Sequence, residues 1–247
     1  MKFVTEKATI VESLQNAAAI AERRQTIPIL ANLRLKTIDG RLEVTATDLE
    51  IQIKTFSDLL EIKEEGETTV SARKMSELCR SLPDNENVEF CLENGKLSVS
   101  SRNFNADFAT ISSDDFPEIE INEEQRPISI DSAKFKRVLS KTSFSMASQD
   151  VRYYLNGMLL EIGAGKINGV ATDGHRLAFS SVKAASTELE TRNILPRKAV
   201  LELAKLLSSN NESIELLIGA SYVDIRTENL RFCSKLIDGK YPDYDKV

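Results

Sequence analysis

Hydrophobic and polar residues alternate along several stretches of the chain, which is the pattern expected of half-buried β-strands. In residues 32–48 an Asp-Gly pair at 39–40 interrupts the alternation, so a hairpin with a tight turn is predicted. Residues 87–111 alternate around an Asn-Gly pair in the same way and predict three more strands. Two further segments, 2–7 and 50–56, also have the character of strands.

Four other segments carry apolar residues at the spacing of an amphipathic helix. The segments predicted to be helical are 8–24, 73–82, 132–148 and 197–208. The second of these follows Ser71, a residue type that caps helices, and stops before Pro83. Short helices among many antiparallel strands define an α+β protein.

The pattern is repeated within the chain. Residues 30–48 (LANLRLKTIDGRLEVTATD) align without a gap on residues 155–173 (LNGMLLEIGAGKINGVATD), 125 positions further on. The segment 72–82 resembles 196–207 at nearly the same offset, and a third match surrounds two prolines 125 positions apart. Three matches in one order and at nearly one offset indicate a duplicated domain.

We therefore predict two domains, residues 1–124 and 125–247, each made of two helix-plus-strands units. The boundary falls near residues 122–127 (NEEQRP), a polar stretch that ends in proline. A length of 247 residues also fits two domains better than one.

The predicted helices are basic although the chain is acidic. With Lys7 counted at the start of the first helix, they hold 13 Lys or Arg residues against 4 Asp or Glu, whereas the formal net charge of the whole chain is −6. In the third helix, Lys134, Arg137 and Lys141 share one face. If the helices line one surface, that surface attracts phosphates while the strands repel them. The charges alone leave open that these are ordinary solvated helix faces.

The remaining composition argues against several classes of protein. No run of 18 apolar residues is present and the N-terminus lacks the hydrophobic stretch of a signal peptide, so we expect a cytoplasmic protein without membrane contact. Cys79, Cys91 and Cys233 lack a metal-binding spacing and are expected to be small core residues. No metal or cofactor is predicted.

The only histidine, His175, lies between Asp173 and Arg176 in the segment VATDGHRLAF. A catalytic role is disfavoured, because the chain shows no nucleophile elbow, phosphate-binding loop or paired-carboxylate motif. In a structural role, Gly174 permits a tight corner and Asp173 accepts hydrogen bonds from backbone N–H groups. The Thr-Asp pair recurs at 47–48 without the glycine and the histidine, which supports the structural role of this pair.

Several segments together resemble one protein family. They are QTIPILANL, ATDLE, ARK, SQDVRYYLNGM, ATDGHRLA, PRK and DGKYPDY. Over the whole chain this combination is similar to the bacterial sliding clamps, the beta subunits of DNA polymerase III.

The resemblance implies a non-catalytic processivity factor that encircles duplex DNA without sequence specificity. It implies clamp domains with antiparallel sheets outside and helices on the inner face. In that family each subunit has three such domains, and two subunits form a head-to-tail homodimeric ring. The chain resembles the first two domains, so we expect the third to be absent.

The resemblance also implies a pocket for short hydrophobic peptides of the polymerase alpha subunit, the clamp loader and other partners. The matching positions are Leu155, Thr172, Gly174, His175, Arg176, Leu177, Pro242, Lys246 and Val247. An apolar slot with a polar rim suits Leu and Phe anchors of a partner. At position 246 the family often has arginine, and lysine keeps the charge without the planar fork. Since the missing domain would complete the pocket, we expect weak peptide binding.

DNA-contacting positions transfer from the same resemblance. They are Arg24, Arg73, Gln149, Tyr153, Tyr154, Arg197 and Lys198. The basic side chains would neutralise phosphates and the tyrosines would stack on bases. For the tyrosines, packing within a strand with one ring inward and one outward stays open. The rival interpretation of the whole chain is a β-rich protein-interaction scaffold that does not bind DNA.

Overall fold

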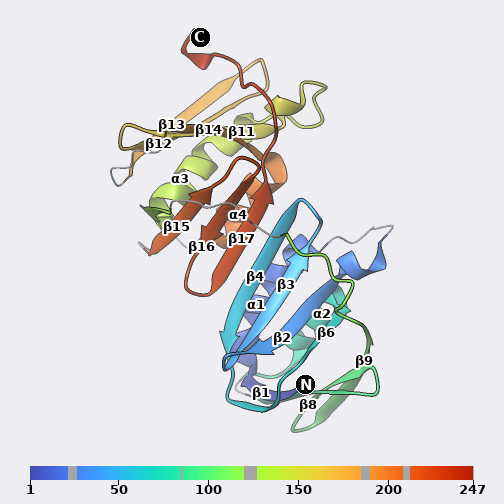
Figure 1. Cartoon of the computed structure of the whole chain (residues 1–247). Helices are drawn as coiled ribbons and strands as arrows, with labels where there is room; N and C mark the ends of the chain where they lie inside the picture. Colours follow the sequence, from blue (N-terminus) through green and yellow to red (C-terminus); the bar gives the residue numbers. More distant parts are fainter. Residues whose placement is uncertain (22–26, 85, 120–126, 185–189, 208–211, 247) are drawn as a thin grey trace. The chain divides into compact units, whose positions relative to one another are not determined.

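The computed structural model of the chain describes residues 1–21, 27–84, 86–119, 127–184, 190–207 and 212–246. The chain divides into two compact units (Figure 1). Unit 1 comprises Met1–Glu120 with Glu228–Arg231, and unit 2 comprises Ile121–Thr227 with Phe232–Val247.

Unit 1 is built from antiparallel strands and two α-helices. Its strands are β1 (Lys2–Glu6), β2 (Asn32–Ile38), β3 (Arg41–Thr47), β4 (Ile51–Asp58), β5 (Glu61–Glu64), β6 (Glu67–Ser71), β7 (Asn87–Glu93), β8 (Lys96–Ser101) and β9 (Phe104–Ile111). They are hydrogen-bonded in the order β4-β3-β2-β6-β9-β8-β7-β1-β5. The helices are α1 (Lys7–Ile20) and α2 (Ala72–Ser81), with a 3-10 turn η1 (Pro28–Ala31) before β2. Helix α1 packs against β3, β4 and α2.

Unit 2 repeats this plan with two four-stranded sheets. Its strands are β10 (Ile128–Asp131), β11 (Gly157–Gly163), β12 (Lys166–Thr172), β13 (Leu177–Lys183), β14 (Thr191–Pro196), β15 (Ser213–Ile218), β16 (Tyr222–Arg226) and β17 (Leu230–Lys235). The sheet orders are β13-β12-β11-β14 and β10-β15-β16-β17. The helices are α3 (Ser132–Thr142) and α4 (Arg197–Leu206), with 3-10 turns η2 (Ser143–Ser145), η3 (Tyr153–Leu155) and η4 (Tyr244–Lys246). Helix α3 packs against β12, β13 and α4. In the described part of the chain, no helix is long and apolar enough to cross a membrane.

The helices bury their apolar faces as the spacing predicts. In α3, Phe135, Val138 and Leu139 are fully buried, whereas Arg137 and Lys141 are exposed. Removing such side chains from water provides most of the stabilisation of short helices, since helices of this length are marginal by themselves.

The predicted hairpins are confirmed. Strands β2 and β3 pair in antiparallel register around the Asp39-Gly40 turn, and β7 and β8 pair around Asn94-Gly95. Both turns have positive φ at both central residues, which fits the twist of the flanking strands. Ala164-Gly165 makes the corresponding turn in unit 2, with φ values of 47° and 70°.

Two predicted helix ends are wrong. The helix expected over 132–148 ends at Thr142, whose hydroxyl donates to the carbonyl oxygens of Val138 and Leu139, and the chain then tightens into the η2 turn. A β-branched residue that bonds the preceding turn is a poor site for helix continuation. The helix expected over 8–24 ends at Ile20. Arg23 and Arg24, counted among the helical cations, lie outside the described residues.

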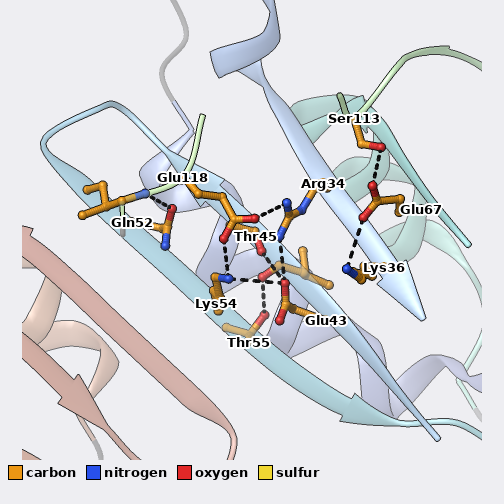
Figure 2. Close-up of polar contacts among 12 residues, drawn as sticks. Arg34, Lys36, Glu43, Thr45, Gln52, Lys54, Thr55, Glu67, Ser113 and Glu118 are labelled. Atoms are coloured by element: carbon orange, nitrogen blue, oxygen red, sulfur yellow. Dashed lines mark hydrogen bonds and ion pairs between the residues drawn. The ribbon is translucent and has the colours of Figure 1, made fainter. Parts of the chain in front are cut away.

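A segment that follows β9 crosses the face of β2, β3 and β4 that carries Arg34, Glu43 and Lys54. Charged side chains hold it there (Figure 2). Arg34 on β2 donates to Glu43 on β3 at 3.1 Å and also to Glu118. Lys54 on β4 lies 2.6 Å from the Glu118 carboxylate. The backbone N–H of Ile119 donates to Gln52 at 2.9 Å. We call residues 112–119 the strap.

Candidate functional site

The sequence around His175 folds as a turn between β12 and β13, which we call the 172–176 turn. The Thr172 hydroxyl donates to the carbonyl of Arg176 at 2.7 Å and accepts from the N–H of Gly174 at 3.0 Å. The Asp173 carboxylate accepts from the N–H groups of His175 and Arg176 at 3.0 and 3.1 Å. These bonds fix the backbone from Thr172 to Arg176 and leave the His175 side chain exposed.

The same turn occurs in unit 1. The Thr47 hydroxyl donates to the carbonyl of Ile51 at 2.8 Å and accepts from the N–H of Leu49 at 3.1 Å. The Asp48 carboxylate accepts from the N–H groups of Glu50 and Ile51. Because the bonds match those of unit 2 at an offset of 125 residues, the Thr-Asp pair has a structural role in both units. Asp173 is therefore engaged in holding the turn.

An apolar surface lies beside the 172–176 turn. Leu155 is 2% exposed and belongs to a cluster with Tyr241 and the half-buried Tyr244. Leu177 and Phe179 point outward from β13 and are 38% and 51% exposed. The Phe179 ring lies 6.0 Å from that of Tyr244. This arrangement provides a buried base and exposed apolar side chains above it.

The C-terminal segment of unit 2 is tied to this surface by its tyrosines. The Tyr241 hydroxyl accepts from the N–H of Thr172 at 3.0 Å, and burial raises the pKa of Tyr241 to about 12. The Tyr244 hydroxyl donates to Glu161 on β11. Burial and this hydrogen bond raise the pKa of Tyr244 to about 12. Both phenols therefore stay neutral at physiological pH and act as fixed hydrogen-bonding groups.

The structure brings most of the predicted pocket residues into one region of unit 2. Thr172, Gly174, His175, Arg176 and Leu177 form the turn and the start of β13. Pro242 follows Tyr241 and is exposed. Lys246 pairs with Asp243 at 2.8 Å and is 80% exposed. Val247 lies outside the described residues.

Sequence reasoning missed four residues of this surface: Phe144, Phe179, Tyr241 and Tyr244. The Arg176 guanidinium lies 5.7 Å from the centre of the Phe144 ring. A signal for Phe179 was present, because alternation in a strand places residues 177 and 179 on the same face. Tyr241 corresponds to the buried Phe116 at the repeat offset, which identifies it as an anchor of the segment.

The residues before β11 form a second fixed element, the 149–156 loop. Asp150 binds the Arg152 guanidinium at 3.0 and 2.9 Å and also accepts from the Arg152 N–H. The Asn156 side chain accepts from the N–H of Asp150 and donates to its carbonyl. Gln149 adopts a left-handed conformation with φ of 60°. The loop therefore has a defined shape although half of its residues are exposed.

We predict a low titration midpoint for Asp150. The side-chain hydrogen bond from Arg152, with its backbone N–H bond, lowers the pKa of Asp150 from 3.8 to about 2. The ion pair therefore stabilises the folded loop at pH values above 3.8, and this stabilisation is lost as the pH falls through about 2. Carbon-13 NMR of the Asp150 carboxyl should show this midpoint, and Arg152→Ala should return it toward the ordinary value. An unshifted midpoint in the unmodified chain would contradict the observed pair.

The two predicted DNA-facing tyrosines do not lie in a strand. Tyr153 and Tyr154 form the 3-10 turn η3, so the interpretation that strand alternation separates them is wrong. Their rings meet edge to face at 5.9 Å. Tyr153 is 58% exposed, and Tyr154 packs against the cluster around Leu155. The tight turn, not a strand, thus places one ring outward and one inward.

The other predicted DNA residues have different surroundings. Arg73 on α2 is exposed and pairs with Glu77 at 2.9 Å. The Arg197 guanidinium donates to the carbonyl of Met146 at 2.8 Å, so this arginine supports the chain after α3. Lys198 is half-buried at the start of α4. Arg24 lies outside the described residues.

Comparison with known proteins agrees with this architecture. The family model for the DNA polymerase III beta subunit, N-terminal domain, matches residues 1–120, and the model for its central domain matches residues 129–243. The beta sliding clamp of Pseudomonas aeruginosa is 40% identical over 248 residues, which cover 100% of this chain and 68% of that protein. The beta sliding clamp of Escherichia coli K12 is 38% identical with the same coverage.

Solved structures of DNA polymerase III beta subunits also match this chain. The crystal structure of the DNA polymerase III subunit beta from Pseudomonas aeruginosa matches with a TM-score of 0.96 at 39% identity, over 100% of this chain and 67% of that one. A sliding clamp from the same organism, solved with griselimycin bound, matches with a TM-score of 0.96 at 40% identity, over the same shares of both chains.

The fold and these relatives place the chain in the clamp class, a group of duplicated α+β proteins that act as non-catalytic subunits. The chain belongs to the DNA polymerase III beta subunit family, the beta sliding clamps.

Proposed function

We propose that this chain acts as a DNA sliding clamp that tethers replication proteins to duplex DNA, with its peptide-docking surface on unit 2. The observation that carries the proposal is the apolar surface formed by Leu177, Phe179 and Pro242 over the buried Leu155, beside a turn that hydrogen bonds hold in place. Exposed apolar side chains over a preorganised wall suit a partner's Leu and Phe anchors, because little ordering entropy is lost on docking.

A peptide titration tests the docking surface. We expect a short peptide with Leu and Phe anchors to shift the amide NMR resonances of residues 172–179. Leu177→Ser should weaken the binding about tenfold or more, because an apolar anchor of the peptide then faces a polar side chain. Leu60→Ser is the matched control, because Leu60 is a 55% exposed leucine in unit 1. Equal binding by both variants would show that the surface beside β13 is not the docking site.

The DNA-facing role is supported by the exposed cations of the helices. We propose that they bind phosphates without reading bases, which a sliding protein requires. Replacing Arg137 and Lys141 together with alanine should reduce the slope of log affinity against log salt by about 0.9 for each phosphate that the protein no longer neutralises. Fluorescence anisotropy with two short duplexes of unrelated sequence measures this slope. The absence of any salt-dependent binding would favour a protein-interaction scaffold instead.

The assembly in which we place this activity is a head-to-tail homodimeric ring in the cytoplasm. Its proposed peptide partners are the polymerase alpha subunit and the clamp loader. The support is the family membership together with the 68% coverage of the longer relatives. Native mass spectrometry of the protein as it is expressed in its own cells gives the subunit mass and the number of subunits directly.

A further inference from the structure

The Arg152 side chain lies directly on the backbone of Gly174. A Cβ atom placed on Gly174 would be 3.1 and 3.2 Å from the two terminal guanidinium nitrogens of Arg152, closer than an ordinary van der Waals contact. One of these nitrogens is also 3.5 Å from the carbonyl oxygen of Asp173. The guanidinium would therefore have to shift by a few tenths of an ångström to admit a side chain at position 174.

The matching turn in unit 1 shows that backbone conformation alone does not demand glycine here. Gly174 has a φ of 89°, and its counterpart Leu49 has a φ of 76°. A leucine thus adopts the same left-handed conformation, supported by the same hydrogen bonds. The position equivalent to Arg152 in unit 1 is Ile27, which has no guanidinium. Arginine at 152 and glycine at 174 are therefore a pair that belongs to unit 2 alone of the two repeats.

Each side of this contact is separately fixed. Asp150 orients the Arg152 guanidinium, and Asn156 in turn holds Asp150. On the other side, Thr172 and Asp173 hold the turn that carries Gly174. The Arg152–Gly174 contact thus joins two preorganised elements, one containing Gln149 and one containing His175.

We propose that Arg152 is a positioning residue that couples the 149–156 loop to the 172–176 turn and so sets the shape of the peptide-docking surface. The proposal rests on the function proposed above for that surface. A planar, forked group is needed, because it must bind the Asp150 carboxylate through two nitrogens while the edge formed by its two terminal nitrogens faces Gly174.

The test compares Arg152→Ala, Arg152→Lys and the control Lys205→Ala. Lys205 is an exposed cation paired with one carboxylate, so its removal changes the net charge equally at a distant site in unit 2. We expect Arg152→Ala to shift the amide resonances of residues 173–176 in the free chain and to weaken binding of the Leu- and Phe-containing peptide about threefold to tenfold. Arg152→Lys should restore less than half of the affinity, and Lys205→Ala should change neither readout.

A double-mutant cycle separates positioning from a general effect on stability. Gly174→Ala alone should weaken peptide binding, because its methyl group displaces the guanidinium. In the Arg152→Ala background, Gly174→Ala should weaken peptide binding much less, since the guanidinium is already absent. Leu49→Ala in the equivalent turn should leave peptide binding unchanged.

Two outcomes would overturn the proposal. In the first, Arg152→Ala leaves the resonances of residues 173–176 and the peptide affinity unchanged while the unmodified chain binds peptide. In the second, Gly174→Ala weakens peptide binding by the same factor with and without Arg152. Failure of the unmodified chain to bind peptide would instead overturn the proposed function, and with it the role of Arg152 in that binding.

Discussion

Replacing Arg34 with methionine is expected to destabilise unit 1 by about 3–5 kcal/mol, the usual cost of removing one partner from a buried ionic network. The Arg34 side chain is 9% exposed and binds Glu43, whose side chain is 12% exposed, and Glu118. Without it, Lys54 is the remaining cation that the figure shows on the two carboxylates, and Glu43 keeps only the Thr45 hydroxyl in addition (Figure 2). Urea unfolding followed by circular dichroism measures the change in the free energy of unfolding.

The same substitution should release the strap. Phe116 lies under the Arg34 guanidinium at 5.6 Å, and the Ile119 N–H bond to Gln52 depends on the strap staying in place. Hydrogen exchange at Ile119 should therefore accelerate in Arg34→Met more than exchange in β7 or β8. Lys63→Met is the control, because Lys63 makes its ion pair with Glu89 at an exposed position. A variant as stable as the unmodified chain would show that the network does not hold the strap.

The strap network also has a predictable pH dependence. Burial opposes ionisation of Glu118, but hydrogen bonds from Lys54 and Arg34 outweigh it and lower the pKa of Glu118. A lowered pKa means that the stabilisation is present above the ordinary value of 4.5 and is lost as the pH falls below it. Acid should therefore weaken the attachment of the strap at Glu118.

The local elements of the fold were predictable because short-range chemistry determines them. Hairpin turns depend on two residues with positive φ, and Asp39-Gly40 and Asn94-Gly95 supply them in adjacent positions. The repeat was visible because the two units need the same buried residues at the same spacing. The end of α3 was not predictable from apolar spacing, because the spacing continues past Thr142 while the backbone tightens there into the η2 turn.

The charged network and the Arg152–Gly174 contact could not be predicted, because both join segments that are far apart in the sequence. Alternation places Leu33 and Leu35 in the core and would leave Arg34 on a solvated face. The strap covers that face, so Arg34 is buried and needs partners from β3 and from residue 118. For the site, resemblance supplied the 172–176 turn. Leu49 adopts the same conformation in unit 1, so the contact with Arg152 is what explains glycine after the Thr-Asp pair of unit 2.

Gly157→Ala is expected to destabilise unit 2 by about 1–3 kcal/mol, the range found for overpacked cores. A Cβ atom at Gly157 would lie 2.4 Å from the carbonyl oxygen of Leu195 and 2.9 Å from the side chain of Ile194. Both neighbours lie on β14, which pairs with β11, so relief requires a shift of the backbone between two strands. Thermal unfolding followed by calorimetry measures the change.

Gly163→Ala provides the control within the same strand. A Cβ atom there meets only the Glu190 side chain, at 3.5 Å, which is an ordinary contact. Because Leu155 lies two residues before Gly157, a shift of β11 should also weaken peptide binding, whereas Gly163→Ala should leave binding intact. Equal stability of the two variants would mean that β11 and β14 separate without cost. The close approach of these strands would then not be what holds the base of the docking surface.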